Sequence, residues 1–172
     1  MRHAGVGATT IAVIPQKQAL LKEIAKVFET AGISLDLTDN ADNLIWGKLI
    51  VNVGINALVA ILRVQNGVLG ITPQCEKLMA KAVDEAVKVA EASGITLPWT
   101  SPLEHVKKVC AATAQNRASM LQDILHNRRT EIGMINRAIV RKGEKLGIAA
   151  PFNLFLSEMI EALEATADHR IR

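Results

Sequence analysis

The feature that most restricts the fold is a nearly unbroken apolar stretch from Trp46 to Gly67, with the sequence WGKLIVNVGINALVAILRVQNG. A stretch of this length without proline is typical of a buried helix. Only Lys48, Asn52 and Asn56 interrupt its apolar centre, and their spacing of four residues aligns them on one helix face. This pattern indicates either a face that opens onto a wet site or buried polar groups with hydrogen-bond partners. The residues alone leave both interpretations open.

The composition agrees with a core of closely packed helices. Of the 172 residues, 49% are apolar but only 3% are aromatic, and tyrosine does not occur. Alanine, isoleucine, leucine and valine must therefore fill the core, which suits helices that approach one another closely. The formal net charge is +3, and the basic residues form no cluster larger than short pairs such as Lys107-Lys108. The sequence therefore does not indicate a nucleic-acid-binding protein.

The cysteines and the apolar runs bear on metal content and compartment. Cys75 and Cys110 lie far apart, and no histidine accompanies either at a spacing typical of a metal site. No fully apolar run reaches about 18 residues, and the first residues lack the apolar core of a signal peptide. We therefore expect a reduced, cytoplasmic protein with no metal site and no membrane span.

The first 40 residues differ from the rest of the chain. Residues 10–14 are branched and apolar, and residues 33–38 alternate apolar and polar side chains, so both segments are predicted strands. Between them, residues 17–31 have apolar side chains at helical spacing and end at Gly32. A strand, a helix and a strand cannot bury both faces of a sheet, so we expect the end of a larger α/β domain.

From Asp39 onward every periodic segment is predicted to be helical. The first helix contains Lys48 and is broken by an Asn66-Gly67 turn. Ser101 with Glu104 matches a capping box, and Asn153 is the predicted N-cap of the last helix. Five further helices are expected over residues 72–93, 101–113, 118–125, 130–146 and 153–167. The predicted fold class is therefore mainly α, with a small β-α-β unit at the start.

A second group of polar residues lies between Asn116 and Asn136. Ser119 and Asp123 are one helical turn apart and share a face. Glu131 falls in the first turn of the helix predicted from residue 130, where the helix dipole favours a negative charge. The simple structural interpretation, surface polar groups and helix-start chemistry, is the one that this spacing alone favours.

Two blocks of the sequence resemble ketopantoate reductase (2-dehydropantoate 2-reductase). The first is W-x-K-L-x-x-N-x-x-I-N at residues 46–56, followed by Asn66-Gly67. The second begins with S-x-x-x-D at Ser119 and a basic turn. It continues with T-E-I-x-x-I-N at residues 130–136 and G-x-x-x-G-I-x-x-P-x-N at residues 143–153. Both blocks occur in the family's order and spacing, and the resemblance extends over residues 1–165.

The resemblance implies a fold and a domain division. Residues 40–172 would form a helical substrate-binding and catalytic domain of the 6-phosphogluconate-dehydrogenase-like kind, and residues 1–39 would be the remnant of an NADP-binding Rossmann domain. The family's G-x-G-x-x-G loop is missing, and Gly5-Val6-Gly7 does not replace it because no strand precedes it and no third glycine follows. Gly133 stands where an acidic residue is frequent, and Arg137 where a glycine is frequent, so both departures concern local helix packing.

Enzymes of this family transfer a hydride from NADPH to the keto carbon of ketopantoate, giving pantoate for pantothenate biosynthesis. By resemblance, Lys48 would be the general acid that protonates the developing alkoxide. Asn52 and Asn56 would hold the lysine and the substrate hydroxyl. Asn66 would contribute from the turn, and Ser119 would bind the substrate carboxylate. Glu131 would fix the geometry as the second catalytic residue.

The resemblance also predicts partners and leaves alternatives. NADPH would serve the complete enzyme, but we expect no cofactor bound to this chain alone, because the phosphate-cradling loop is missing. We expect a homodimer that acts on a small 2-keto acid, with neither nucleic acid nor membrane as a partner. One alternative is a related reductase of another 2-keto acid. The other is a helical interaction or dimerisation domain without catalytic activity.

Overall fold

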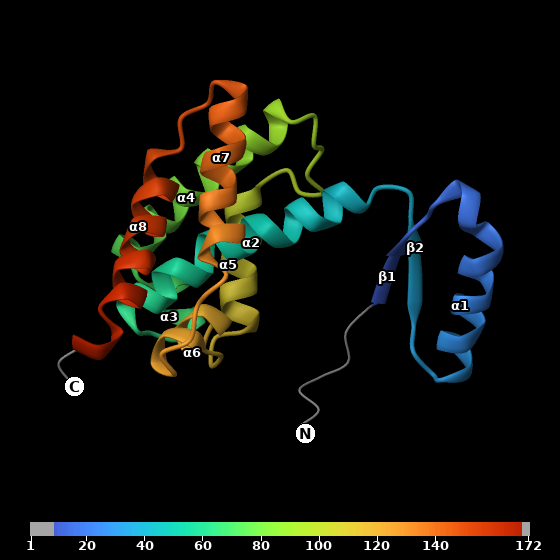
Figure 1. The fold of residues 1–172 in the computed structure, drawn as a ribbon, viewed down its shortest axis with the longest axis horizontal. Helices are drawn as coiled ribbons and strands as arrows, with labels where there is room; N and C mark the ends of the chain where they lie inside the picture. Colours follow the sequence, from blue (N-terminus) through green and yellow to red (C-terminus); the bar gives the residue numbers. More distant parts are fainter. Residues whose placement is uncertain (1–8, 170–172) are drawn as a thin grey trace. The chain divides into compact units, whose positions relative to one another are not determined.

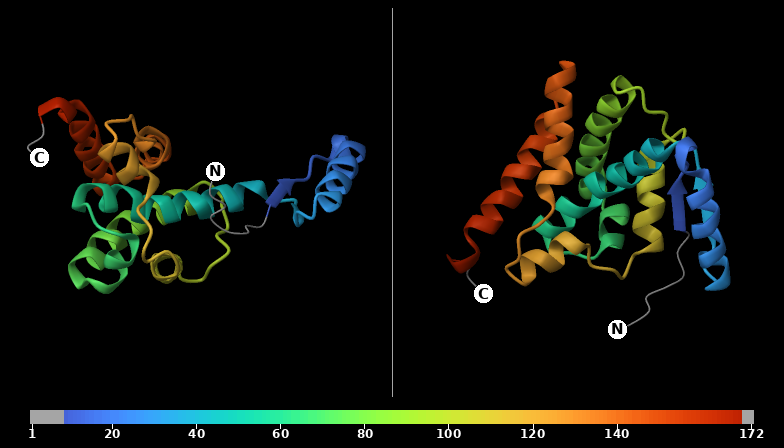
Figure 2. Two further views of the ribbon diagram at one scale, coloured as in Figure 1. Left: turned by 90° about the horizontal axis from the view of Figure 1, so that it is seen from below. Right: turned by 45° about the vertical axis from the view of Figure 1, so that its right-hand side comes forward.

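A computed structural model describes residues 9–169 of the chain. The chain divides into two compact units, one up to Ile45 and one from Trp46 onward. Figures 1 and 2 show the first unit as a small β-α-β motif and the second as a helical bundle. The first residues, including Gly5-Val6-Gly7, lie outside the described residues.

The first unit has the predicted order of strand, helix and strand. Its elements are β1 (Thr9–Ala12), the short 3-10 helix η1 (Pro15–Lys17), α1 (Gln18–Thr30) and β2 (Leu35–Thr38). The two strands are parallel, with Thr9 opposite Leu35 and Ala12 opposite Thr38. Gly32 has a φ of +68°, which any other residue adopts only with strain, and it turns the chain out of α1.

The second unit is helical throughout, which confirms the predicted fold class. Its elements are α2 (Ala41–Leu62, which begins in the first unit), α3 (Asn66–Ile71), α4 (Pro73–Ala92), α5 (Pro102–Ala112), α6 (Ser119–Leu125), η2 (Ile132–Met134), α7 (Asn136–Leu146), α8 (Pro151–Ala165) and η3 (Ala167–His169). Within this bundle α7 packs along α8, and both contact α4, while α3 packs against α4 and α5.

Helix α2 forms the centre of the helical unit. Every residue from 53 to 60 is buried. At Gly54 the helix meets α4 and α5 so closely that an added Cβ would lie 2.9 Å from Val83 and 3.0 Å from Val106. By length and composition α2 is the one helix among residues 9–169 that could cross a membrane. Because 56% of that window is buried within the protein, the helix serves as a core element here.

Three local predictions are wrong at helix ends. Arg63 takes a φ of 55° and ends α2, and Asn66-Gly67 then begins α3 instead of forming a turn. Ser101 precedes α5 without a side-chain capping bond, because Glu104 pairs with Lys107 instead of closing a capping box. Asn153 is the third residue of α8 and not its N-cap. Each error concerns a partner that helical spacing does not reveal.

Candidate active site

The polar stripe of α2, defined as Lys48, Asn52 and Asn56, follows one face of the helix and becomes more buried along it. Lys48 is exposed, Asn52 is half-buried and Asn56 is only 8% exposed. Within residues 9–169, none of these side chains forms a hydrogen bond or an ion pair. An ammonium and two amides therefore have no protein partner among the described residues, so the alternative of buried polar groups with hydrogen-bond partners does not describe this pattern.

Asn66 is held at the start of α3 by two hydrogen bonds. Its Nδ2 donates to the Thr113 Oγ1 at 3.0 Å, and its backbone N–H donates to the Asn116 carbonyl at 3.0 Å. The side chain is buried, and its Oδ1 has no donor among the described residues. Asn66 thus presents one acceptor oxygen that the surrounding protein has left unpaired.

The start of α3 is also joined to the loop between α5 and α6. Gly67 donates its N–H to the Ala114 carbonyl at 3.2 Å, and Gln65 Nε2 donates to the Gln115 carbonyl at 3.3 Å. An added Cβ on Gly67 would lie 2.6 Å from the Cβ of Ala114, so glycine is what permits this approach. The loop leads directly into α6, whose first residue is the exposed Ser119. The fold therefore brings Asn66 to the segment that precedes Ser119.

Glu131 does not occupy the first turn of a long helix, as the sequence had suggested. It is an exposed residue in a loop that leads into η2, and α7 begins only at Asn136. Glu164 of α8 fixes this loop, because its Oε1 accepts the Thr130 N–H at 2.7 Å. The Thr130 Oγ1 in turn accepts the Ile132 N–H at 3.2 Å. These bonds hold the loop in place before η2.

The two departures from the family pattern have local partners. The carbonyl of Gly133 accepts a hydrogen bond from Arg141 Nη2 at 2.7 Å, which also braces the loop. Arg137 makes a forked pair with Glu161 of α8, through Nη2 at 2.7 Å and Nε at 3.2 Å. The hydrogen bond to Glu161 raises the pKa of Arg137, so the guanidinium stays charged.

A buried polar network was missed by sequence reasoning. Asn136, at the start of α7, donates from Nδ2 to Asn153 Oδ1 at 2.9 Å and to the Val53 carbonyl of α2 at 3.4 Å. Both asparagines are completely buried. They belong to the motif that resembles the reductase family, yet no role was predicted for Asn136, and Asn153 was predicted only as a helix N-cap. A polar residue at a buried helical position is the signal that could have found them.

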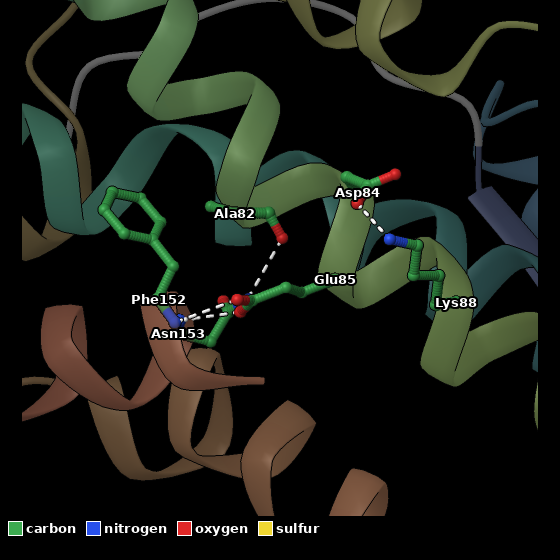
Figure 3. A network of polar contacts seen from close by, with 6 residues as sticks. All are labelled: Ala82, Asp84, Glu85, Lys88, Phe152 and Asn153. Carbon is green, nitrogen blue, oxygen red and sulfur yellow. Dashed lines mark hydrogen bonds and ion pairs between the residues drawn. The ribbon is translucent and has the colours of Figure 1, made fainter. Parts of the chain in front are cut away.

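Glu85 of α4 completes this network, as Figure 3 shows. Its carboxylate accepts the backbone N–H groups of Phe152 and Asn153, both at 2.9 Å, and Asn153 Nδ2 at 2.8 Å. Asn153 Nδ2 also donates to the Ala82 carbonyl at 3.1 Å. The carboxylate thereby satisfies N–H groups at the start of α8 that have no partner within that helix.

The turn of α2 before Lys48 is packed against an aromatic pair. Trp99 stacks on His105 with ring centroids 3.8 Å apart, and an added Cβ on Gly47 would lie 2.9 Å from Trp99 Cη2. Burial, followed by the positive charge of Lys108, lowers the pKa of His105. The pair therefore places a neutral, bulky wall next to the backbone that positions Lys48.

The remaining titratable groups offer no metal chemistry. Among residues 9–169, no three histidine, cysteine, aspartate or glutamate side chains are grouped so that they could hold a metal ion. Both cysteines are free thiols. Burial raises the pKa of Cys110 to about 11, so that thiol stays protonated near neutral pH.

A dinucleotide has no evident cradle in the described part of the chain. The connection from β1 to α1 passes through Pro15 and contains no glycine. In a Rossmann fold the glycine-rich turn follows the first strand, because only glycine lets the backbone approach the phosphates. The connection from β1 to α1 is not such a turn, so the described residues do not include that loop.

Comparison with known proteins identifies the family. The sequence profile described as "Ketopantoate reductase PanE/ApbA C terminal" matches residues 40–164. The chain belongs to this family. It is 37% identical over 161 residues to the 2-dehydropantoate 2-reductase of Halobacterium salinarum, covering 93% of this chain and 53% of that protein. It is 36% identical over 162 residues to that of Vibrio cholerae, covering 94% and 54%.

Solved structures give the same fold. The PanE/ApbA family ketopantoate reductase from Ralstonia eutropha JMP134 matches with a TM-score of 0.88 and 31% identity, over 98% of this chain and 55% of that one. D-mandelate dehydrogenase with NADH and anilino(oxo)acetate matches with a TM-score of 0.84 and 32% identity, over 97% and 70%. The chain thus spans about half the length of the curated reductases it matches.

Proposed function

We propose that this chain supplies the C-terminal catalytic and substrate-binding half of an NADPH-dependent reductase that converts 2-dehydropantoate to pantoate. One observation supports this most directly: among residues 9–169 the polar stripe of α2, which lies in the helical domain of the reductase family, has no hydrogen-bond or ion-pair partner. The hydrogen bonds of Asn66 hold it against the loop before Ser119, so a second set of polar groups lies in the same helical domain.

Lys48 is the proposed proton donor. An ammonium can polarise a keto oxygen by hydrogen bonding and then protonate the alkoxide that hydride addition creates. The side chain is exposed and unpaired within the described residues, so it can reach a ligand without breaking an ion pair. Asn52 and Asn56, one and two turns further, supply neutral groups for the lysine and the substrate hydroxyl.

The other site residues are assigned positioning roles in the same proposal. Ser119 offers a hydroxyl to the substrate carboxylate, and Asn66 contributes from the start of α3. Glu131 orients the lysine or the substrate hydroxyl from its braced loop. The nicotinamide cofactor would supply the hydride, and its site is proposed for the part of the reductases that this chain does not cover.

The substrate is the finer part of the proposal. D-mandelate dehydrogenase, which the chain matches closely in fold, was solved with the keto-acid-like anilino(oxo)acetate. A reductase of a different 2-keto acid is therefore the second candidate. A fusion of the N-terminal half of the Halobacterium salinarum reductase to this chain can be assayed for NADPH oxidation with 2-dehydropantoate and with phenylglyoxylate. Faster turnover of phenylglyoxylate than of 2-dehydropantoate would favour the second candidate, a reductase of a different 2-keto acid.

Lys48→Ala tests the catalytic assignment in this fusion, with Lys108→Ala as a matched exposed-lysine control. We expect kcat to fall about 10³-fold in the first variant, because a general acid and its electrostatic effect are both lost. The control should retain turnover within about twofold. If Lys48→Ala reduces 2-dehydropantoate as fast as the unaltered fusion, Lys48 is not the proton donor.

Assembly and compartment belong to the same proposal. We infer a cytoplasmic homodimer, supported for assembly by the exposed apolar side chains of Ile71 and Met134 on the helical unit. A dimeric ketopantoate reductase from Staphylococcus aureus shares the fold at 21% identity. Sedimentation equilibrium of the chain measures the assembly, and a monomer at micromolar concentration would contradict it. A monomer would also contradict the alternative of a non-catalytic dimerisation domain.

A further inference from the structure

We propose that Glu85 is a positioning residue that sets the orientation of the polar stripe of α2 through Asn153 and Asn136. The stripe's role as a keto-acid site rests on the proposed function, but its orientation can be measured without any ligand. Glu85 lies on α4 and forms no hydrogen bond with Lys48 or with the two stripe amides among the described residues. The buried network is the hydrogen-bonded route by which it can act on α2.

The first link is the carboxylate of Glu85 at the start of α8. Oε1 accepts one N–H, from Phe152, and Oε2 accepts two, from the backbone and the side chain of Asn153. Figure 3 shows these bonds converging on one carboxylate beside the Ala82 carbonyl. An ionised carboxylate only accepts hydrogen bonds, so the Asn153 side chain must point its amide nitrogen toward α4.

The second link follows from the first. With Asn153 Nδ2 committed to Glu85 and Ala82, Asn153 Oδ1 must face Asn136. Asn136 must then present its own Nδ2, and the second hydrogen of that amide reaches the Val53 carbonyl. The Glu85 carboxylate and the Ala82 and Val53 carbonyls can only accept here, so together they set the orientation of both amides.

The unpaired oxygen of Asn136 fits this arrangement. Its Oδ1 is buried and has no donor among the described residues. Leaving a buried acceptor unpaired is costly, so Asn136 would not choose this orientation for its own hydrogen bonding. The acceptors around the network, the Glu85 carboxylate among them, impose it.

The last link acts on α2 between the stripe residues. Val53 lies directly after Asn52 and three residues before Asn56, so a bond to its carbonyl fixes the rotation of this helical turn. Gly54 is wedged against α4 and α5 on another side. A rotation of about 10° would move an atom about 6 Å from the helix axis by about 1 Å. A misplacement of about 1 Å can reduce turnover about 10²-fold, so orientation matters for the proposed site.

The experiment compares Glu85→Ala with Glu85→Gln and with Asp84→Ala. Asp84 is the matched control, because it is the neighbouring carboxylate but pairs with Lys88 on the surface at 2.6 Å. Two quantities are measured in the whole chain: the side-chain amide NMR signals of Asn52 and Asn56 without ligand, and the Kd for pantoate. Signals are assigned with Asn52→Asp and Asn56→Asp variants.

We expect Glu85→Ala to shift both stripe amide signals and to raise the Kd for pantoate about tenfold. Glu85→Gln keeps one acceptor oxygen for Asn153, so it should recover most of the signal positions and affinity. Asp84→Ala should match the unaltered chain in both measurements. A role confined to stabilising α8 would lower the free energy of unfolding but leave the stripe signals in place.

Asn136→Leu provides a second variant if Glu85→Ala does not fold. It removes the bond to Val53 while leaving every bond of Glu85 intact, and the same shift of the stripe signals is expected. Unchanged stripe signals in Glu85→Ala, or in Asn136→Leu where the first variant is unfolded, would overturn the inference. If the unaltered chain binds no pantoate, the proposed function is contradicted, whereas the ligand-free signals still decide the role of Glu85.

Discussion

The β-α-β unit and the helical unit differ in how much apolar surface they bury. Among residues 9–45 only Leu21 is buried, while Val27 and Leu37 remain 66% and 53% exposed. In the helical unit a continuous core surrounds α2, and residues such as Leu156 are almost completely buried. A two-stranded sheet with one helix is too small to exclude water from both of its faces.

The two units therefore contribute differently to the chain. The helical unit contains both a core and the polar groups proposed for catalysis, so it can hold its site residues by its own packing. The β-α-β unit has the element order of an α/β domain but lacks the layers that such a domain needs. The following experiments test this contrast, beginning with the largest expected effect.

Dividing the chain tests most directly whether the two units differ in stability. We expect residues 40–172 to unfold in a single cooperative transition, because that fragment retains the core around α2. A peptide of residues 1–40 should show no transition, because only Leu21 is buried among residues 9–40. Circular dichroism against temperature measures both. A cooperative transition in the short peptide would show that the β-α-β unit is stable by itself.

A pair of leucine truncations sharpens the contrast residue by residue. Leu156→Ala should lower the free energy of unfolding by about 3 kcal/mol, because it leaves a cavity in a closed core. Leu37→Ala should change it by less than about 0.5 kcal/mol, because the side chain is already half in water. Urea unfolding of the whole chain gives both values. Equal losses would mean that Leu37 is covered in solution.

A smaller effect is expected at the partly exposed pair of Arg137 and Glu161. Arg137→Ala should cost at most about 1 kcal/mol, because water screens the pair even though its geometry is forked. A double-mutant cycle with Glu161→Ala isolates the interaction. The coupling should fall in high salt, and a coupling that is insensitive to salt would indicate packing by the arginine stem instead.

The smallest expected effect concerns pH. Burial holds the pKa of His105 below its usual value, so between the two values the unfolded chain binds more protons than the folded one. Stability should therefore fall as the pH drops from about 7 to about 5, and rise as the pH is restored. His105→Phe keeps a ring against Trp99 and should flatten this dependence. An identical slope in the variant would assign it to other groups.

The sequence predicted the helices well because their apolar periodicity is local information. Residues 72–93 and 101–113 were predicted helices, and α4 and α5 match them within two residues at each end. Helix ends were less predictable where a distant side chain decides them. Glu164 is 34 residues from Thr130, and Glu85 is 67 residues from Phe152. Each carboxylate nevertheless accepts a backbone N–H there, and local spacing does not reveal such a distant partner.

The candidate site likewise has some features that sequence spacing predicts and others that it does not. Alignment of Lys48, Asn52 and Asn56 follows from their spacing, and the structure confirms that they share one helix. Their increasing burial does not follow from spacing, because it depends on which elements pack around each turn. The roles of Asn136 and Asn153 were also hidden, since a motif gives residue types but not whether they face a ligand or each other.

The unequal burial along α2 has a consequence for local polarity. At Lys48 water is present and weakens charge interactions, whereas at Asn56 it is almost excluded. A molecule that lies along this helix face would keep a hydrated charge at one end and meet stronger hydrogen bonds at the other. Such a gradient of effective dielectric constant selects ligands that are ionic at one end and neutral but hydrogen-bonding at the other.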